Sequence, residues 1–460
     1  MIERILAILV VLVAVEGLHH HFCRGHDSDR HWCLRKGVVP IDRGIEYSQI
    51  LPFSDEWDAF FRDSLEKTHL SPFQFWFRCI DREVRGYFYV ERLSPLDHDK
   101  EAYMQPDFYR HNLKITADGE PVDFRVWNGG GDIFFNISAN ASIDHMVIIK
   151  IDGFKHFTRF PVSKCHKARP VSTEQRFIMN SHLKDFAEKY EFNPVIVEGV
   201  LNHMYYHRCA LRLDKYEMVV QSEYVSTFLA NEKIARAVED GWLTLLVRNP
   251  VIPSPIKIVN SSSCYYMAYT QNMAILQHWK ENVKIYFFDT DEYVNSAPDV
   301  TSQEFFQIVN NHTSVALMRR MIFCKDCDQS KPDITTISLT KSTLMLNDHL
   351  LSDPKLVVDP NRVGCFIVHW AGCGDVTIRS PVERLYIIHF EELYTRRWGI
   401  LDRLSLGNET VFKPPPMVEK CDPSRYDWTQ PLPNFHLRKQ KIRYNLNLSD
   451  IKRANRSVRD

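Results

Sequence analysis

The segment between residues 176 and 294 constrains the fold most, because apolar strand-like runs alternate there with amphipathic helical patterns. The predicted strands are 176–180, 216–220, 242–247 and 285–288, and the predicted helices are 194–207, 226–239 and 265–280. Such alternation requires crossover connections, and it is typical of a parallel sheet covered by helices on both faces. We therefore expect an α/β domain built on a mostly parallel sheet.

The last of these strands runs directly into Asp289-Thr290-Asp291-Glu292. Ligands of open α/β sheets lie beyond the carboxyl ends of the strands, and two acids one residue apart can face one pocket if the chain bends there. Carboxylates without a basic neighbour in sequence suit a hard divalent cation that holds a phosphate-bearing substrate. The alternative is an acidic turn at the end of a core strand, and the motif alone does not decide between the two.

The segments around this domain have a different character. Residues 71–165 carry short aromatic and β-branched runs separated by Gly, Pro, Asp and Asn, which predicts a β-rich, sandwich-like accessory domain. The α/β domain itself is expected at 172–412. We predict an irregular lead-in at 18–70 and a basic, disordered tail at 413–460, where apolar periodicity is missing.

The N-terminus predicts entry into the secretory pathway. Arg4 precedes an apolar run of 11 residues that ends at Val15, whereas a bilayer-spanning helix needs roughly 20. This pattern favours a signal peptide at 1–17 over a buried helix, because the polar His19 and its neighbours follow at once. A short signal anchor is the other option, and the membrane would then be reached only through this segment.

Sequons, cysteines and charge agree with that compartment. The seven Asn-x-Ser/Thr sequons are at Asn136, Asn140, Asn260, Asn311, Asn408, Asn447 and Asn455. With these sequons and eleven cysteines, we expect a disulfide-bonded glycoprotein of the Golgi or ER lumen, or a secreted one. The 57 basic and 58 acidic residues balance, so we expect no nucleic-acid partner.

Four stretches occur in a fixed order between residues 175 and 400. They are Glu198-Gly-Val-Leu-Asn-His203 with the strand that follows Leu213; Gln271-Asn-Met-Ala274; Phe288-Asp-Thr-Asp-Glu-Tyr293; and Lys355 to Pro360 with Val368-His369 and Ile388-His389-Phe390. In this order they resemble glycosyltransferase family 92 and the related family-2-like transferases, which have a GT-A fold. The likeness departs at Phe390, where the family usually has Tyr.

The resemblance implies a metal-dependent hexosyltransferase. It would move a hexose, with galactose as one candidate, from a nucleotide diphosphate sugar to a glycan or glycoprotein acceptor with inversion. The expected metal ligands are Asp289, Asp291 and His389, and the expected substrate-binding residues are Asp289, Glu292 and Gln271. An imidazole among carboxylates favours Mn²⁺ over Mg²⁺. His389 is equally interpretable as a core histidine satisfied by hydrogen bonds, and His369 is the second candidate ligand.

The sequence does not assign the catalytic base or the residues that bind the diphosphate. The catalytic residue is unknown, because inverting transfer needs a general base near the acceptor hydroxyl and several acids are in range. These acids are Asp326, Asp328, Asp375 and Glu383. Arg319 and Arg320 could pair with the diphosphate, but a basic strand end that faces solvent is the preferred interpretation.

Two functions of other classes compete with the transferase. One is a catalytically inactive module on the same fold that binds a glycan or a nucleotide sugar. The other is a metal-dependent phosphohydrolase, for which the sequence contains neither a His-rich dinuclear ligand set nor a nucleophile motif.

Overall fold

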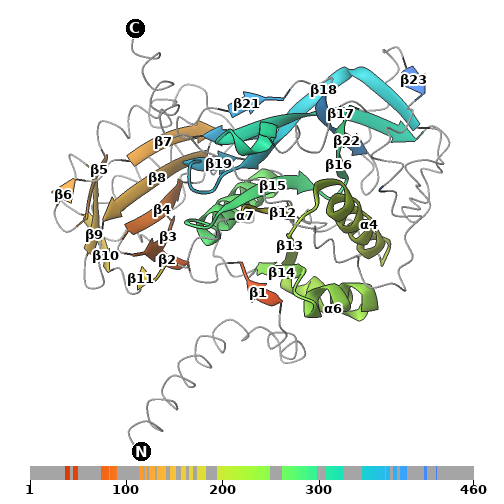
Figure 1. Cartoon of the computed structure of the whole chain (residues 1–460). Coiled ribbons are helices and arrows are strands. Elements are labelled where there is room, and N and C mark those ends of the chain that lie inside the picture. The colour runs from red at the N-terminus through yellow and green to blue at the C-terminus, as the bar shows by residue number, and fades with distance from the viewer. Residues whose placement is uncertain are drawn as a thin grey trace, which may run out of the picture. The chain divides into compact units, whose positions relative to one another are not determined.

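The computed structural model in Figure 1 describes residues 37–41, 45–49, 74–81, 83–90, 113–117, 120–121, 124–129, 132–140, 146–151, 157–161, 165–168, 174–182, 194–248, 262–297, 300, 307–324, 344–367, 369–372, 377–380, 384–390, 409–411 and 421. All of them belong to one compact unit that extends to Tyr426. The predicted leader 1–17 lies outside the described residues, as does the predicted tail 413–460 apart from Cys421.

The largest sheet has eleven strands, and one half of it is parallel (Figure 1). In spatial order this half consists of β1 (Val38–Pro40), β14 (Leu243–Arg248), β13 (Lys215–Gln221), β12 (Arg176–His182) and β15 (Val283–Asp289). Every neighbouring pair in it is parallel. The four strands predicted from the alternation are all present, and β1 joins them from the lead-in predicted to be irregular.

The other half of the sheet is mixed. Beyond β15 lie β18 (Leu344–Val358), β17 (Ser314–Cys324), β22 (Leu385–Phe390) and β16 (Glu292–Ser296), with β21 (Thr377–Arg379) beside β17 and β23 (Glu409–Val411) beside β18. β18 is antiparallel to both β15 and β17, and β16 is antiparallel to β22. The α/β class is thus confirmed, and most strand pairings of the large sheet are parallel, with antiparallel pairings at β15–β18, β17–β18, β16–β22 and β18–β23.

Strand β18, which begins at Leu344, is not among the strands predicted from the alternation. Polar residues such as Asn347 and Asp348 interrupt its apolar pattern, so the local signal is weak. The strand nevertheless pairs with β17 as far as Leu344, with register shifts near Arg319 and Arg320 that absorb the irregularity. Cross-strand pairing overrides local propensity here.

Helices α7 (Ser262–Gln277) and α4 (Pro194–Leu211) pack on opposite faces of the sheet. Residues Met273–Leu276 of α7 share a buried cluster with Ile285 and Phe287 of β15. On the other face, the ring of His207 from α4 contacts Phe288, whose side chain has the opposite orientation along the strand. The prediction that helices cover both faces is therefore correct for these two helices.

The helix predicted at 226–239 is interrupted. It consists of a 3₁₀ turn (Ser222–Tyr224), α5 (Val225–Ala230) and α6 (Glu232–Glu239). At the break, the Asn231 side chain accepts hydrogen bonds from the backbone N–H groups of Lys233 and Ile234. Asn231 thus starts a new helix as its N-cap. Gly241 follows α6 with a φ of 74°, which a residue without a Cβ adopts at little cost.

Two further sheets contain the strands between residues 46 and 166. The six-stranded sheet comprises β11 (Cys165–His166), β3 (Gln74–Ile80), β4 (Glu83–Val90), β8 (Asp132–Asn140) and β7 (Phe124–Gly129), with β2 (Glu46–Gln49) beside β3. The four-stranded sheet comprises β10 (Phe157–Pro161), β9 (Met146–Ile151), β5 (Leu113–Ala117) and β6 (Glu120–Pro121). Their packing as a sandwich, and the boundaries 71–165 and 172–412, stay predictions.

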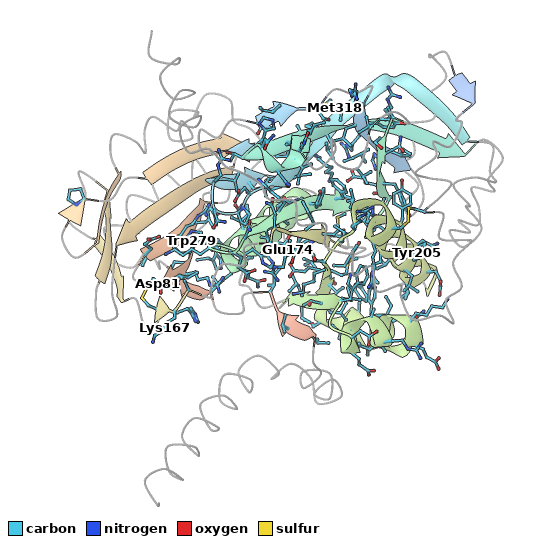
Figure 2. All side chains as sticks on the ribbon, viewed as in Figure 1. Asp81, Lys167, Glu174, Tyr205, Trp279 and Met318 are labelled. Carbon is cyan, nitrogen blue, oxygen red and sulfur yellow. A yellow bond between two sulfur atoms is a disulfide. The ribbon has the colours of Figure 1, made fainter. Side chains whose placement is uncertain are left out.

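The six-stranded sheet contacts the large one through buried side chains. Trp76 and Tyr87 belong to the same buried cluster as α7 and β15. The Arg85 guanidinium donates to the carbonyls of Pro360 and Val363, beside a small hairpin of β19 (Cys365–Ile367) and β20 (Trp370–Gly372). At this contact Lys280 donates to the Ile80 carbonyl, and the Asp81 N–H donates to the His166 carbonyl; Asp81 is labelled in Figure 2.

Within the described part of the chain, two disulfides tie distant segments together. Cys79–Cys165 joins β3 to β11, and Cys209–Cys421 joins α4 to a buried cysteine inside the segment predicted to be a disordered tail. These bonds indicate an oxidising compartment, as predicted. Among the described residues, no helix combines the length and the apolar character that a membrane crossing requires.

Candidate metal centre

The acidic run forms the turn between β15 and β16. Asp289 is the last residue of β15, Thr290 and Asp291 make the turn, and Glu292 begins β16. On the parallel side, Asp289 is in register with His182, the last residue of β12. The acids therefore lie at the carboxyl end of the parallel strands, where open α/β sheets bind ligands.

Asp289 is paired with a lysine inside the protein. Its Oδ2 atom lies 2.8 Å from Nζ of Lys355, and the side chains are 6% and 1% exposed, respectively. Lys355 comes from β18, 66 residues further along the chain. The distance between the two charged groups is short and both side chains are almost fully buried. The lysine therefore compensates the charge of the buried carboxylate.

Glu292 is engaged at both carboxylate oxygens. Its Oε1 atom accepts from Nη1 of Arg319 at 3.0 Å, and its Oε2 atom accepts from the backbone N–H of Asp289 at 2.8 Å. Burial opposes the charge on Arg319, but the carboxylates of Glu292, Asp289 and Asp291 together outweigh it and raise the pKa of the arginine above its usual value. Arg319 is thus a buried partner of the acidic turn, not a solvent-facing strand end as the sequence favoured.

Asp291 and His389 meet at the more open side of the turn. His389 Nε2 lies 3.5 Å from Asp291 Oδ2, and the Asp291 side chain is 15% exposed. His389 stands directly across the β16–β22 ladder from Glu292. Donor atoms of Asp291, Glu292 and His389 all lie within 4.8 Å of one another, which is the spacing of a metal-ligand set.

This donor group offers two carboxylates and one imidazole, a combination that suits Mn²⁺ by its chemistry. Asp291 and His389 therefore fit the expected ion. The fit is incomplete at Asp289, which the structure leaves outside this group of donors and pairs with Lys355. The acids have no basic neighbour in sequence, but Lys355 and Arg319 approach them from other strands. Three carboxylates and two fixed cations leave the turn with a small net negative charge.

Among the described residues, the remaining sequence candidates are not members of this donor group. Gln271 is buried in α7, next to Asn272, which bonds the backbone of Phe366. His369 bonds the Pro354 carbonyl through Nδ1 at 2.9 Å. The four candidate bases at 326, 328, 375 and 383 lie outside the described residues. The catalytic base therefore stays unassigned.

Helix α4 contributes residues to the turn that the sequence reasoning missed. His203 bonds the Glu292 carbonyl through Nε2 at 2.8 Å and the Tyr216 hydroxyl through Nδ1 at 2.6 Å. The Tyr206 hydroxyl donates to the Val294 carbonyl at 2.7 Å, and the Val294 N–H donates to Nε2 of His207 at 3.2 Å. The sequence could have indicated these residues, because they follow the helical spacing of the apolar residues on the buried face of α4.

Both histidines of α4 are neutral. Burial lowers the pKa of His203 to about 4, against the smaller opposing effects of the Glu292 carbonyl and the nearby aspartates. Burial also lowers the pKa of His207 well below its usual value, and the neighbouring His203 adds to that shift. His207 bonds the His203 carbonyl through Nδ1, so Nδ1 carries the proton and Nε2 remains the acceptor.

A second buried histidine lies on the opposite face of the sheet. His278 Nε2 lies 3.1 Å from Glu217 Oε1, and its Nδ1 lies 3.0 Å from Glu281 Oε2. Burial alone would lower its pKa, but the two carboxylates raise it to about 9. Burial likewise opposes the charge of Glu217, yet His278 and Lys215 hold the pKa of that carboxyl well below its usual range.

Compared with known proteins, the chain matches no family model and no curated protein.

Proposed function

We propose that this protein is a metal-dependent glycosyltransferase of GT-A-like fold. It moves a hexose from a nucleotide diphosphate sugar to a glycan or glycoprotein acceptor in the secretory pathway, with inversion at the anomeric carbon. One observation carries the proposal: an acidic turn ends the last strand of a parallel set, and Asp291 and His389 stand 3.5 Å apart at that turn.

Each residue at the turn has a separate role in this proposal. Asp291 and His389 would hold a divalent cation, with Mn²⁺ as the expected ion. A cation bound there would offset the charge that develops on the diphosphate leaving group. Glu292, fixed by Arg319 and the Asp289 N–H, sets the direction of the chain through the turn. Lys355 pairs with Asp289 and holds it in place at the end of β15.

The positive charges of Lys355 and Arg319 favour a second function. Lys355 and Arg319 neutralise two of the three carboxylates, whereas tight binding of a divalent cation profits from uncompensated negative charge. A module that binds a glycan or a nucleotide sugar without turnover needs no such ion. This charge balance therefore favours the inactive module as the alternative.

The deciding experiment uses the full chain purified from a secretory expression host. Hydrolysis and transfer are measured with a panel of sugar nucleotides, with and without Mn²⁺, for the wild type, Asp291→Asn and Asp240→Asn. Asp240 is exposed beyond α6, so its variant matches the charge change away from the turn. The transferase predicts turnover that requires Mn²⁺ and is lost in Asp291→Asn alone.

Two other results would decide against it. If no sugar nucleotide shows Mn²⁺-dependent turnover or binding, the transferase proposal is wrong. If a glycan or a sugar nucleotide binds without turnover and without Mn²⁺, the binding module replaces it.

A further inference from the structure

Strand β16 ends the large sheet, and its outer edge needs hydrogen-bond partners. Among the strands that the structure describes, β16 pairs with β22 and with no strand on its other side. In an antiparallel ladder the N–H and C=O of one residue point to the same side, and the side alternates along the strand. Every second residue of β16 therefore directs both backbone groups away from β22. Because the strand is buried, these groups require partners within the protein.

Side chains of α4 provide these partners. Val294 has both of its backbone groups bonded by α4: its N–H donates to His207 and its C=O accepts from Tyr206. Two residues earlier, the Glu292 carbonyl accepts from His203. Residues 292 and 294 are two apart, as the alternation along an outward-facing edge requires.

The spacing on the helix matches the spacing on the strand. His203, Tyr206 and His207 are separated by three and four residues, so they lie on one face of α4. One helical turn rises about 5.4 Å, and two strand residues span about 6.6 Å. One turn of helix thus follows one repeat of the strand edge, and the side chains act as a short replacement for a neighbouring strand.

We infer that His203, Tyr206 and His207 are positioning residues for the acidic turn. By fixing the backbone of β16 at Glu292 and Val294, they set the direction in which the chain leaves the turn. That direction places the Glu292 carboxylate on Arg319 and keeps Asp291 opposite His389. The effect on cation binding rests on the proposed function, but the effect on the strand does not.

The hydrogen-bond pattern dictates which substitutions preserve the arrangement. His207 offers Val294 an acceptor and donates through its other nitrogen to the His203 carbonyl. A glutamine has one acceptor and one donor group and can replace this function, whereas leucine fills the space and offers neither. Tyr206→Phe removes only the hydroxyl that bonds the Val294 carbonyl.

The test is amide hydrogen exchange at Val294, read at single-residue level by fragmentation mass spectrometry on the full chain. The variants are His207→Leu, His207→Gln and Tyr206→Phe. Tyr205→Phe is the matched control, since Tyr205 is the adjacent residue on α4, labelled in Figure 2. Loss of one hydrogen bond is expected to raise the exchange rate in His207→Leu about tenfold. His207→Gln should restore most of the protection, and Tyr205→Phe should leave it unchanged.

A second readout separates this inference from the proposed function. Mn²⁺ titration should show affinity weakened in His207→Leu and recovered in His207→Gln. If the wild type binds no Mn²⁺, the proposed function fails, and the exchange rates still decide the positioning role. Unchanged exchange at Val294 in folded His207→Leu and Tyr206→Phe, or equal acceleration by Tyr205→Phe, would overturn it.

Discussion

Two buried histidines of α4 and one buried histidine on the opposite face of the large sheet have opposite charge states. On the α4 face, His203 and His207 are neutral and serve as hydrogen-bond partners of the backbone. On the α7 face, His278 is a cation between Glu217 and Glu281. Burial disfavours the imidazolium in both places, so the difference comes from the groups in direct contact.

The groups that bond a buried histidine directly affect its pKa more than charged groups that are only nearby. The negative charges of Asp289 and Asp291 act on His203, yet its ring nitrogens are occupied by Tyr216 and the Glu292 carbonyl, and its pKa still falls to about 4. His278 bonds carboxylates with both nitrogens, and its pKa rises to about 9. The two faces therefore impose opposite pH dependences on folding, and the following experiments are designed to separate them.

Removal of the charge on Glu217 should have the largest effect. Glu217→Gln leaves the buried His278 with one carboxylate in place of two, and loss of a partner from a buried ion pair costs about 3–5 kcal/mol of unfolding free energy. Urea unfolding at neutral pH measures this value. Glu239→Gln, an exposed match on α6, should behave like the wild type. A loss in Glu217→Gln no larger than that of its match would show that the α7 face holds no strong ion pair.

The α4 face should make the protein less stable in acid. The pKa of His203 is about 4 in the folded chain and near 6.5 in the unfolded one, so only the unfolded chain gains a proton as the pH falls below 6.5. The stability lost between pH 6.5 and about 4 amounts to about 3 kcal/mol. Urea unfolding across this range should show the loss in the wild type and a flatter profile in His203→Gln. Parallel profiles for the two proteins would contradict the neutral state of His203.

The α7 face should make the protein less stable at alkaline pH. The pKa of His278 is raised to about 9, so its stabilisation is complete below pH 6.5 and is lost as the pH rises through 9. We expect a loss of about 3 kcal/mol, because the pKa difference between the folded and the unfolded chain has the same size as that of His203. The difference in unfolding free energy between wild type and His278→Gln, followed from pH 6 to pH 9.5, isolates this term. A difference that does not change with pH would assign His278 to the neutral class.

The smallest effect should come from Tyr216→Phe. This change removes the hydroxyl at 2.6 Å from Nδ1 of His203 and leaves a buried acceptor without its donor. The expected cost is about 1–2 kcal/mol, measured by thermal unfolding at pH 7. Because no carboxylate is involved, the alkaline part of the stability profile should stay as in the wild type. A changed alkaline profile would mean that the two faces are coupled through the sheet.

Much of the parallel half of the fold could be predicted from sequence, because its strands and helices carry strong local patterns. All seven residues of β15 are buried, and the run is continuously apolar in its centre. The break at Asn231 was missed because a capping residue inside an apolar periodicity resembles an ordinary polar position. β18 was missed because its pairing with β17, not its own composition, makes it a strand.

The candidate site was predictable only in its sequence-local part. The acids at 289, 291 and 292 are visible in one short run, and His389 was reached through a resemblance. Lys355 and Arg319 lie 66 and 27 residues away from the carboxylates they bond, and only the strand order of the mixed half brings them together. No periodicity within a single segment could reveal them.

The Cys209–Cys421 disulfide has a consequence for the time course of biosynthesis. Its cysteines are 212 positions apart, and every strand of the large sheet except β1 and β12 is encoded between them. At about 5–20 residues per second, about 10–40 s separate the emergence of the two thiols from the ribosome. Cys209 must wait on α4 as a thiol, or as a temporary mixed disulfide, until the last part of the sheet has been made. A chain truncated before residue 421 would keep the Cys209 thiol without the partner that the complete chain provides.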